Sequence, residues 1–526
     1  MSQSRQRRMG GQPLFILSED SERTSGGDAQ SSNITAGKAV SEAVRTTLGP
    51  RGMDKMLVSD DGDVVITNDG ATILDKMDIE HPAAQMLSDV AETQEDEVGD
   101  GTTTASVLAG ELLSQAEHLL DDDVHPTTIV EGYHRAAQFA QEAIEELAVA
   151  TDLDDEELLE VAESSMTGKG TGDVPARALA QTVVDAVRHI DGDGVNRDNV
   201  RIHTQAGAAS SATELIEGVI VDEDRASEEM PAHVSDAAIA VVEQDLEVRE
   251  SNIDAEYQVT NVDELNAALD SELAQLRAYA DDLVASGADG VFLDGDVDSR
   301  VTSVLVEEGL LVFDDVGSDT PTDVVQATGA TRVGSVETLE ADDLGYAEDI
   351  RVERFGDDEL VFIEGGENAE AVTIFARGST KHVADELERA LNDSLDVVTA
   401  ALTAGGVVPG AGATEIYAAN HVRESAASVE GRRQLAIEAF ADALDVLPRT
   451  LAENTGMDSI DALVELRAAH DGGTTAGIIS EGQTGIIGDP LEYGVLDPAA
   501  VKREAVGSAT EAATMIVRID DVISAS

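Results

Sequence analysis

The sequence predicts a multidomain fold of the α + α/β class, in which a mainly helical part is split in sequence around an inserted α/β part. Three observations lead to this prediction. The chain has 526 residues, too many for one hydrophobic core. Helical spacing of apolar residues dominates the first 150 residues and returns after about residue 372. Between about 215 and 365, short β-rich runs alternate with helical stretches.

The N-terminal part is predicted to be mostly helical. It begins with a helix over 33–48, after which Gly49 is expected to serve as the helix C-cap. The run DKMLVSDDGDVVITNDG then predicts a β-hairpin around an acidic Asp-Gly turn. Apolar periodicity predicts further helices over about 83–91, 102–120 and 126–148. The acidic run ATDLDDEE near residue 150 is interpreted as a joint between domains.

The middle of the chain changes pattern. Strands are predicted for runs such as IEGVIVDE, AAIAVVE, GVFLDG and LLVFDDV, and one long amphipathic helix is predicted over about 263–286, ending at Gly287. From about residue 372 the pattern predicts a strand, AVTIFARG, followed by the helix HVADELERALNDSLDVVTAAL and a glycine-rich turn. Helices are expected to dominate from there to the end of the sequence.

The composition is strongly acidic, with 107 acidic residues against 33 basic ones and a formal charge of −74 spread along the whole chain. This balance argues against nucleic acid and anionic membranes as partners, because phosphate binding needs basic patches. Lysine occurs only at positions 38, 55, 76, 169, 381 and 502. We interpret the composition as an adaptation to molar salt, where the Debye length falls to roughly 3 Å and surface charges repel little. Ordinary acidic solubility is the alternative.

Several classes of protein are excluded by simple counts. The chain has no cysteine, which excludes disulfides, thiolate nucleophiles and zinc-thiolate sites and fits a reducing, cytoplasmic location. No secretory signal is expected, because no apolar run follows the basic start MSQSRQRRMGG. No membrane span is expected, because no apolar run reaches about eighteen residues. The P-loop pattern is absent. His81 and His125 each precede a proline at a predicted helix start and are expected to be structural.

The strongest chemical motif is GDGTTTA, at the start of the helix predicted over 102–120. Its glycines let the backbone approach a ligand closely, and a helix N-terminus attracts anions through its free N–H groups and its dipole. The motif therefore predicts a phosphate-binding loop, with Asp100 as a ligand of Mg²⁺ beside the phosphates. The alternative is an ordinary helix start after a tight turn.

Other candidate sites are weaker when each is taken alone. The run TNDGAT repeats the Asp-Gly pair with Asp69 and Gly70, but such a run is also an ordinary turn. The glycine-rich loop VVPGAGATE suits backbone contact with a ribose or a phosphate. Lys169, in the loop SSMTGKGTG, either brings a cation to a terminal phosphate or is simply solvated. Asp393 falls off the apolar stripe of its predicted helix, so by itself it is expected to be solvated.

A whole series of motifs is shared, in the same order, with one known family: the sequence resembles the group II chaperonins, the thermosome family of archaea. The motifs that carry the resemblance are TTLGPRGMDKMLV, ITNDGATIL, VGDGTTTASVLAGELL, RALND, PGAGATE, RRQLAIEAFADAL, PRTLAENTGMD and ATMIVRIDDVI. They extend over nearly the whole chain. Together with the acidic, lysine-poor composition, they point to a thermosome subunit from a halophilic archaeon.

The resemblance implies a chaperonin-like division of the chain. A mainly helical equatorial domain that binds ATP would comprise residues 1–150 and 405–526. An intermediate, hinge-like domain would comprise 151–217 and 369–404, and an α/β apical domain that contacts unfolded protein would comprise 218–368. This division agrees with the split pattern of helices and strands in the sequence.

The resemblance also implies roles for single residues. Asp100 matches the magnesium-binding aspartate, and Asp69 and Asp393 match the acids that position or activate the attacking water. Lys169 matches a lysine that senses the terminal phosphate. The other positions that match the nucleotide-binding loops are Leu48, Gly49, Pro50, Gly70, Gly101, Thr102, Thr103, Thr104, Gly410, Gly412 and Asp497.

The implied activity is ATP-dependent folding of unfolded client proteins, with ATP and Mg²⁺ as cofactors, in a homo- or hetero-oligomeric double ring with paralogous subunits. Hydrolysis would proceed by in-line attack of water and would require the hinge to close. The helix over 263–286 matches the helical protrusion that serves this family as a built-in lid. The run TMIVRID, interpreted as an edge strand, and the hairpin over 56–67 match elements that pair between neighbouring subunits.

Two features depart from the family pattern. Ala411 replaces the middle glycine of a triple-glycine loop, and the segment VFDDVGSDTPTDVV is acidic where relatives are often basic. They leave open a nucleotide-binding structural subunit of a mixed ring, with little hydrolysis of its own. A small-molecule kinase is a further alternative, although the sequence offers no second glycine-lined pocket for its substrate.

Overall fold

The computed structural model describes residues 22–59, 62, 64–149, 153–172, 174–190, 195–248, 262–356, 358–366 and 371–524. The basic start, the first residues of the expected joint and the three aspartates of the hairpin turn lie outside these ranges. The chain divides into two compact units, which we describe one at a time. Unit 1 comprises Met1–Ala148, Val408–Tyr493 and Val501–Ser526, and unit 2 comprises Val149–Val407 and Gly494–Ala500. The finer division into five domain segments stays a prediction.

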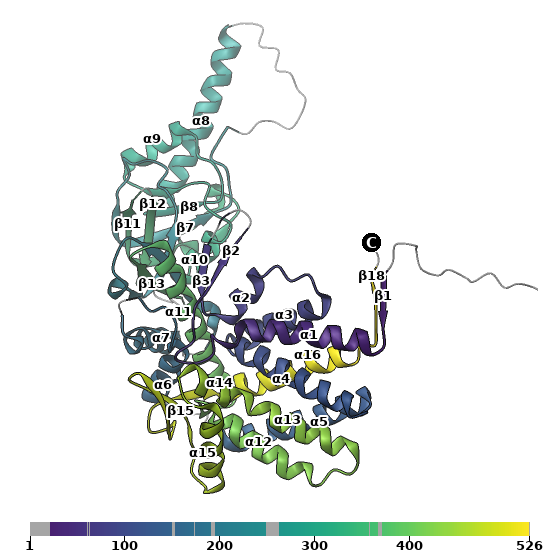
Figure 1. Ribbon diagram of the computed structural model, residues 1–526. Helices are drawn as coiled ribbons and strands as arrows, with labels where there is room; N and C mark the ends of the chain where they lie inside the picture. The colour runs from purple at the N-terminus through teal and green to yellow at the C-terminus, as the bar shows by residue number, and fades with distance from the viewer. Residues whose placement is uncertain are drawn as a thin grey trace, which may run out of the picture. The chain divides into compact units, whose positions relative to one another are not determined.

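A bundle of helices forms most of unit 1 (Figure 1). From the N-terminal part come α1 (Gly27–Arg45), α2 (Gly70–Lys76), α3 (Pro82–Val98), α4 (Thr102–Asp121) and α5 (Pro126–Leu147). From the C-terminal part come α12 (Ala413–Ala426), α13 (Arg432–Leu444), α14 (Val446–Asn454), α15 (Ser459–Asp471) and most of α16 (Ala499–Val517). Helix α4 contacts α1, α3 and α13, and its Leu108, Leu112 and Leu113 are fully buried. The helices predicted here are confirmed.

The end of α1 differs from the prediction. The helix stops at Arg45 with Thr46 as its C-cap, so the expectation that Gly49 caps it is wrong. The reason is a turn: the N–H of Thr47 bonds the carbonyl of Val44, and the chain has already left the helix when it reaches the glycine. Gly49 nevertheless has φ +84°, in the left-handed region that favours glycine.

Two hairpins lie in unit 1. Strands β2 (Lys55–Val58) and β3 (Val64–Thr67) pair antiparallel, which confirms the first predicted hairpin, and they expose Met56, Val58, Val64 and Ile66. Strands β15 (Gly477–Glu481) and β16 (Thr484–Gly488) form the second.

The run TMIVRID, at residues 514–520, is not a strand, so that prediction is wrong. Its first four residues are the last turn of α16, where Ile516 and Val517 are fully buried. Burial of these side chains in the bundle outweighs the strand preference of β-branched residues. The strand is instead β18 (Asp521–Ser524), which pairs antiparallel with β1 (Glu22–Ser25) of the same chain (Figure 1).

A large mixed sheet forms the α/β part of unit 2. Its strands run in the order β6 (Gly218–Asp222), β12 (Asp358–Glu364), β11 (Gly345–Phe355), β7 (His233–Val242), β8 (Gly290–Leu293) and β9 (Leu311–Phe313). Strands β7, β8 and β9 are parallel, as is the short β10 (Arg332–Val333) beside β7, and β6, β12, β11 and β7 pair antiparallel. The α/β pattern predicted for this region is confirmed.

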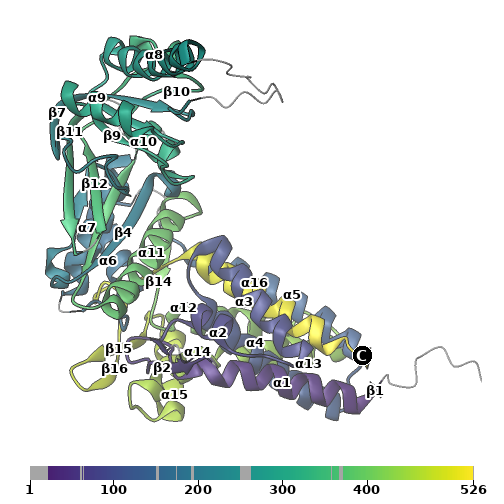
Figure 2. The ribbon, with the colours of Figure 1, turned by 90° about the horizontal axis from the view of Figure 1, so that it is seen from above.

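Helices α8 (Val262–Ser286), α9 (Ser299–Glu308) and α10 (Thr320–Thr328) belong to the same α/β part. The long helix α8 packs against α9 (Figure 2), and its Leu276, Tyr279 and Leu283 are buried at helical spacing. It ends as predicted, because Gly287 follows with φ +83°.

A smaller layer completes unit 2. Its sheet has the order β4 (Val200–Ala206), β13 (Val372–Gly378) and β5 (Glu214–Ile216), and its helices are α6 (Asp155–Met166), α7 (Ala176–Ile190) and α11 (Lys381–Thr403). The boundary between the units falls within strand β14 (Val407–Pro409), and β17 (Leu496–Pro498) lies in the short segment Gly494–Ala500 of unit 2. Within the described ranges, no helix is both long and apolar enough to cross a membrane.

Candidate functional site

The predicted phosphate-binding loop lies between α3 and α4 in unit 1. Gly99 follows α3 with φ +65°, and Gly101 precedes α4 with φ +88°. Both lie in the left-handed region, which explains why this turn needs two glycines. In the described part of the chain no side chain caps the N-terminus of α4. The first N–H groups of this 20-residue helix are therefore open to another acceptor.

Neighbouring helices are capped by their own residues. Asp69 caps α2, His81 caps α3 and His125 caps α5, each by accepting a backbone N–H. The two histidines are thus structural, as predicted. Helices α1, α13 and α14 begin without a side-chain cap as well, and so does α12 after Gly412. Among these uncapped helices, α4 and α12 are the two that follow glycine-rich loops predicted to bind nucleotide.

Asp100 stands directly before the open helix start and is half-buried. Its Oδ1 accepts the N–H of Gly101 at 2.7 Å, and its backbone carbonyl accepts Nε2 of Gln94 at 2.8 Å. The orientation of the carboxylate is therefore linked to the position of the loop backbone.

The motif TNDGAT lies against the start of α4, directly after the motif GDG. A Cβ atom on Gly70 would lie 2.3 Å from Oγ1 of Thr103, so this position has no room for a side chain. Asp69, the residue before it, uses Oδ2 to accept the N–H of Thr72 at 2.7 Å. The motif TNDGAT is thus both a helix start and one wall of the loop that contains Thr102 and Thr103.

The loops that contain Gly49 and Gly412 both contact helix α14. A Cβ on Gly49 would lie 2.3 Å from Cδ2 of Leu451, and Asn454 donates Nδ2 to the carbonyl of Leu48 at 2.8 Å. A Cβ on Gly412 would lie 3.0 Å from Cβ of Pro448. Helix α14 therefore holds two predicted nucleotide-binding loops, which contain Leu48, Gly49, Pro50, Gly410 and Gly412.

Ala411, the departure from the family pattern, adopts φ +57°. Its carbonyl accepts the N–H of Ile478 from β15 at 2.8 Å, which fixes the peptide in place. The alanine thus keeps the left-handed conformation that a glycine would take more easily.

The remaining predicted residues belong to unit 2. Asp393 lies on α11 and is only 7% exposed, and Lys169 forms an ion pair with it through Nζ and Oδ2. The solvated side chain expected from the helical pattern alone is therefore wrong, because the loop that carries Lys169 covers this face of α11. Asp497 lies in β17 and is half-buried.

Sequence reasoning missed Gln94. The side chain is 0% exposed although it is polar, and it bonds the loop at Asp100. A signal was present: Gln94 follows Leu87 and Ala91 at the spacing of one helix face, where a third apolar residue would be expected.

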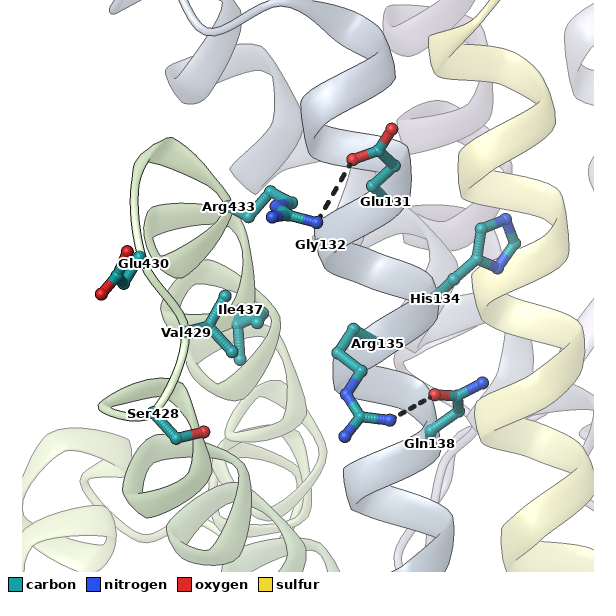
Figure 3. A pocket seen from close by; sticks show the side chains of 10 residues that line it. All are labelled: Glu131, Gly132, His134, Arg135, Gln138, Ser428, Val429, Glu430, Arg433 and Ile437. Carbon is teal, nitrogen blue, oxygen red and sulfur yellow. Dashed lines mark hydrogen bonds and ion pairs between the residues drawn. The ribbon is translucent and has the colours of Figure 1, made fainter.

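A cavity lies elsewhere in unit 1. It measures about 710 Å³ and is formed by α5 and the segment 428–437, as Figure 3 shows. Arg433 approaches Glu131 to 3.7 Å, and Arg135 donates to Gln138 at 2.8 Å. None of the predicted site residues lines this cavity.

Comparison with known proteins assigns the family. The model of the TCP-1/cpn60 chaperonin family matches residues 40–526. The chain belongs to this family. This chaperonin is 61% identical over 517 residues to thermosome subunit 3 of Haloferax volcanii, across 98% of this chain and 99% of that protein. It is 53% identical over 522 residues to thermosome subunit 1 of the same organism, across 99% and 93%.

Thermosome subunit alpha of Halobacterium salinarum is also 53% identical, over 520 residues that cover 98% of this chaperonin and 92% of that protein. Three such relatives in halophilic archaea confirm the group II assignment and the halophilic source, and with them the chaperonin-like fold class and a role in protein folding.

Proposed function

We propose that this chaperonin is an ATP-dependent protein-folding subunit, in which hydrolysis of Mg-ATP drives closure of a built-in lid over unfolded protein. The observation that carries the proposal is the uncapped N-terminus of α4 with Asp100 beside it. Open N–H groups at a helix start bind phosphate oxygens, and an adjacent carboxylate suits a magnesium ion.

The acidic groups fit a metal shared with a nucleotide better than one held by protein alone. Among the described residues, no group of three or more histidine, aspartate or glutamate side chains could hold a metal ion. Magnesium in nucleotide sites usually takes one or two carboxylates plus phosphate oxygens, and Asp100 offers one. When bound, the ion supplies positive charge that neutralises the phosphates.

Asp393 is the group proposed to orient or deprotonate the water that attacks the γ-phosphate, an effect typically worth about 10² to 10⁴ in rate. Its ion pair with Lys169 supports this role, because the pair fixes the direction of the carboxylate. Asp69 is the proposed second acid. Since Asp393 belongs to unit 2 and Asp100 to unit 1, hydrolysis in this proposal requires the units to close on each other.

The assembly is proposed to be a cytoplasmic double ring that binds unfolded client proteins and neither nucleic acid nor membrane. Helix α8 would serve as part of the lid. The exposed apolar side chains of the hairpin β2–β3 support pairing with a neighbouring subunit, since unpaired strand edges otherwise invite aggregation. Because Haloferax volcanii has more than one thermosome subunit, a mixed ring stands beside a homo-oligomer in this proposal.

A structural subunit with little hydrolysis of its own is the rival function, which Ala411 and the acidic segment VFDDVGSDTPTDVV left open. The positive φ of Ala411 counts against the rival, because the loop keeps a glycine-like backbone despite the substitution.

Steady-state phosphate release from Mg-ATP, measured on the purified protein in molar KCl, tests the proposal. The wild type should hydrolyse ATP without any added acceptor, and Asp393→Ala should bind ATP normally but release phosphate at least about a hundredfold more slowly. Asp385→Ala, a half-exposed aspartate on the same helix, is the matched control and should retain the wild-type rate. An assembled wild type without activity would favour the structural subunit.

A further inference from the structure

Gln94 is a buried polar residue that none of the proposed catalytic roles explains. It lies on α3 with a side chain that is 0% exposed, among core residues such as Leu87 and Ala91. A buried amide is costly unless its polar atoms form hydrogen bonds. Its presence at a core position therefore calls for partners at both ends.

Both ends of the Gln94 amide are bonded. Nε2 donates to the carbonyl of Asp100 at 2.8 Å, and Oε1 accepts from the hydroxyl of Ser508 at 3.2 Å. Ser508 lies on α16 and is 5% exposed. The Asp100 carbonyl fixes the direction of the amide, because a reversed amide would set its oxygen against that carbonyl. The Ser508 hydroxyl, which also lies 3.3 Å from Oε1 of Glu504, holds the other end of the amide.

Gly101 is packed closely between Gln94 on α3 and Val501 on α16. A Cβ atom on Gly101 would lie 2.9 Å from Nε2 of Gln94 and 3.0 Å from Cγ1 of Val501 on α16. The loop is thus clamped between α3 and α16. Because Oδ1 of Asp100 accepts the N–H of Gly101, fixing this backbone also fixes the carboxylate.

We propose that Gln94 and Ser508 are positioning residues that hold Asp100 ready for a magnesium ion. The inference rests on the proposed function, which makes Asp100 a metal ligand. Residues that hydrogen-bond to a metal-binding residue and fix its orientation typically contribute tenfold or more to metal affinity. Without them, the metal-binding side chain must be ordered when the ion binds.

Three variants test the inference. Gln94→Met keeps the length of the side chain and removes both hydrogen bonds, and Ser508→Ala removes only the bond to Oε1 of the amide. Tyr133→Phe is the matched control: it removes another buried hydrogen bond, from the Tyr133 hydroxyl to the carbonyl of Leu112 on α4, away from the loop. Ser508→Ala keeps the test decisive even where Gln94→Met fails to fold.

The first measurement is hydrogen exchange of the backbone amides over 99–105 in the nucleotide-free protein. Exchange should be faster in Gln94→Met and Ser508→Ala than in the wild type, because the loop backbone has lost its clamp. In Tyr133→Phe it should match the wild type. Wild-type exchange in all three variants would overturn the inference.

The second measurement is calorimetric titration of ADP at a series of Mg²⁺ concentrations. Magnesium is expected to increase the affinity for ADP, and the Mg²⁺ concentration at half of this increase should rise about tenfold in Gln94→Met and less in Ser508→Ala. The affinity for ADP without magnesium should stay unchanged. If the wild type binds no nucleotide, the proposed function fails. If the wild type binds but Gln94→Met shows the same magnesium dependence, only the present inference is overturned.

Discussion

Ala411 stores backbone strain next to a proposed nucleotide-binding loop. The left-handed region costs an alanine about 1 kcal/mol or more relative to glycine, so Ala411→Gly should raise the free energy of unfolding of unit 1 by about that amount. Thermal unfolding in molar KCl measures this. Ala468→Gly, at an exposed position inside α15, is the control and should lower it by about 1 kcal/mol. A destabilised Ala411→Gly would show that the methyl group has a packing role.

Asp100 is the residue on which magnesium binding should depend. Asp100→Ala should weaken Mg-ATP binding about tenfold or more while ATP binding in the presence of EDTA is preserved, because the N–H groups of α4 remain. Calorimetry with and without magnesium measures both affinities. Equal losses in the two conditions would mean that Asp100 supports the loop rather than a metal ion.

At the scale of single residues, the sequence predicted the chemistry of each motif but not which side chains pack against it. The two Asp-Gly motifs predicted tight turns, and the structure adds that Gly70 lies against Thr103. The helical pattern predicted a solvated Asp393, because periodicity along one helix carries no information about a loop from elsewhere in the chain. Gln94 was missed for the same reason: its partner Ser508 lies 414 residues away.

Among the elements, a buried ion pair ties the segment after β6 to strand β12. Arg225 donates Nε and Nη2 to the two carboxylate oxygens of Glu359 at 3.2 and 3.1 Å, and both side chains are nearly buried. Arg225→Met should therefore lower the free energy of unfolding of unit 2 by about 3 kcal/mol, since it leaves a buried carboxylate with only the more distant Arg354, at 4.0 Å. Arg300→Met, whose pair with Asp298 is exposed, should cost less than about 1 kcal/mol in the same urea titration.

The same pair has a pH dependence of known sign. Its hydrogen bonds hold the pKa of Glu359 below the ordinary value of 4.5, so the stabilisation is present above that value and is lost as the pH falls through the lowered pKa. Urea unfolding below pH 4.5 should lose stability more steeply in the wild type than in Glu359→Gln. If the wild type and Glu359→Gln lost stability equally as the pH falls, protonation of Glu359 would not be linked to unfolding.

Helix and strand types were largely predictable from periodicity, and the exception is instructive. The run TMIVRID has the composition of a strand, yet α16 continues through Val517 because its β-branched side chains fill the core of the bundle. Local preference gives way where tertiary burial is larger.

For the whole molecule, the charge of −74 should make the fold depend on salt. In molar KCl the Debye length is roughly 3 Å, and in dilute buffer the carboxylates repel one another over much longer distances. Dialysis into dilute buffer should therefore unfold or dissociate the protein, as followed by circular dichroism and light scattering. A protein that stays folded and assembled would contradict the halophilic interpretation of the composition.

The split architecture was the most predictable feature at this scale, because helical spacing at both ends and β-rich runs in the middle are both visible along the chain. The boundaries were less predictable. The short segment Gly494–Ala500 also belongs to unit 2, although it lies about ninety residues after the rest of that unit in the sequence. Its Leu496 packs in a hydrophobic cluster that contains Leu158 and Leu391. No local pattern marks such a return.

The pairing of β1 with β18 sets the order in which a newly synthesised chain completes its structure. Residues 22–25 leave the ribosome before unit 2, and their partners, residues 521–524, leave it after unit 2. Most of unit 2 is one continuous stretch that emerges in between and can begin to fold during translation. Strand β1 is therefore made before unit 2 but can pair with β18 only after unit 2 has been made.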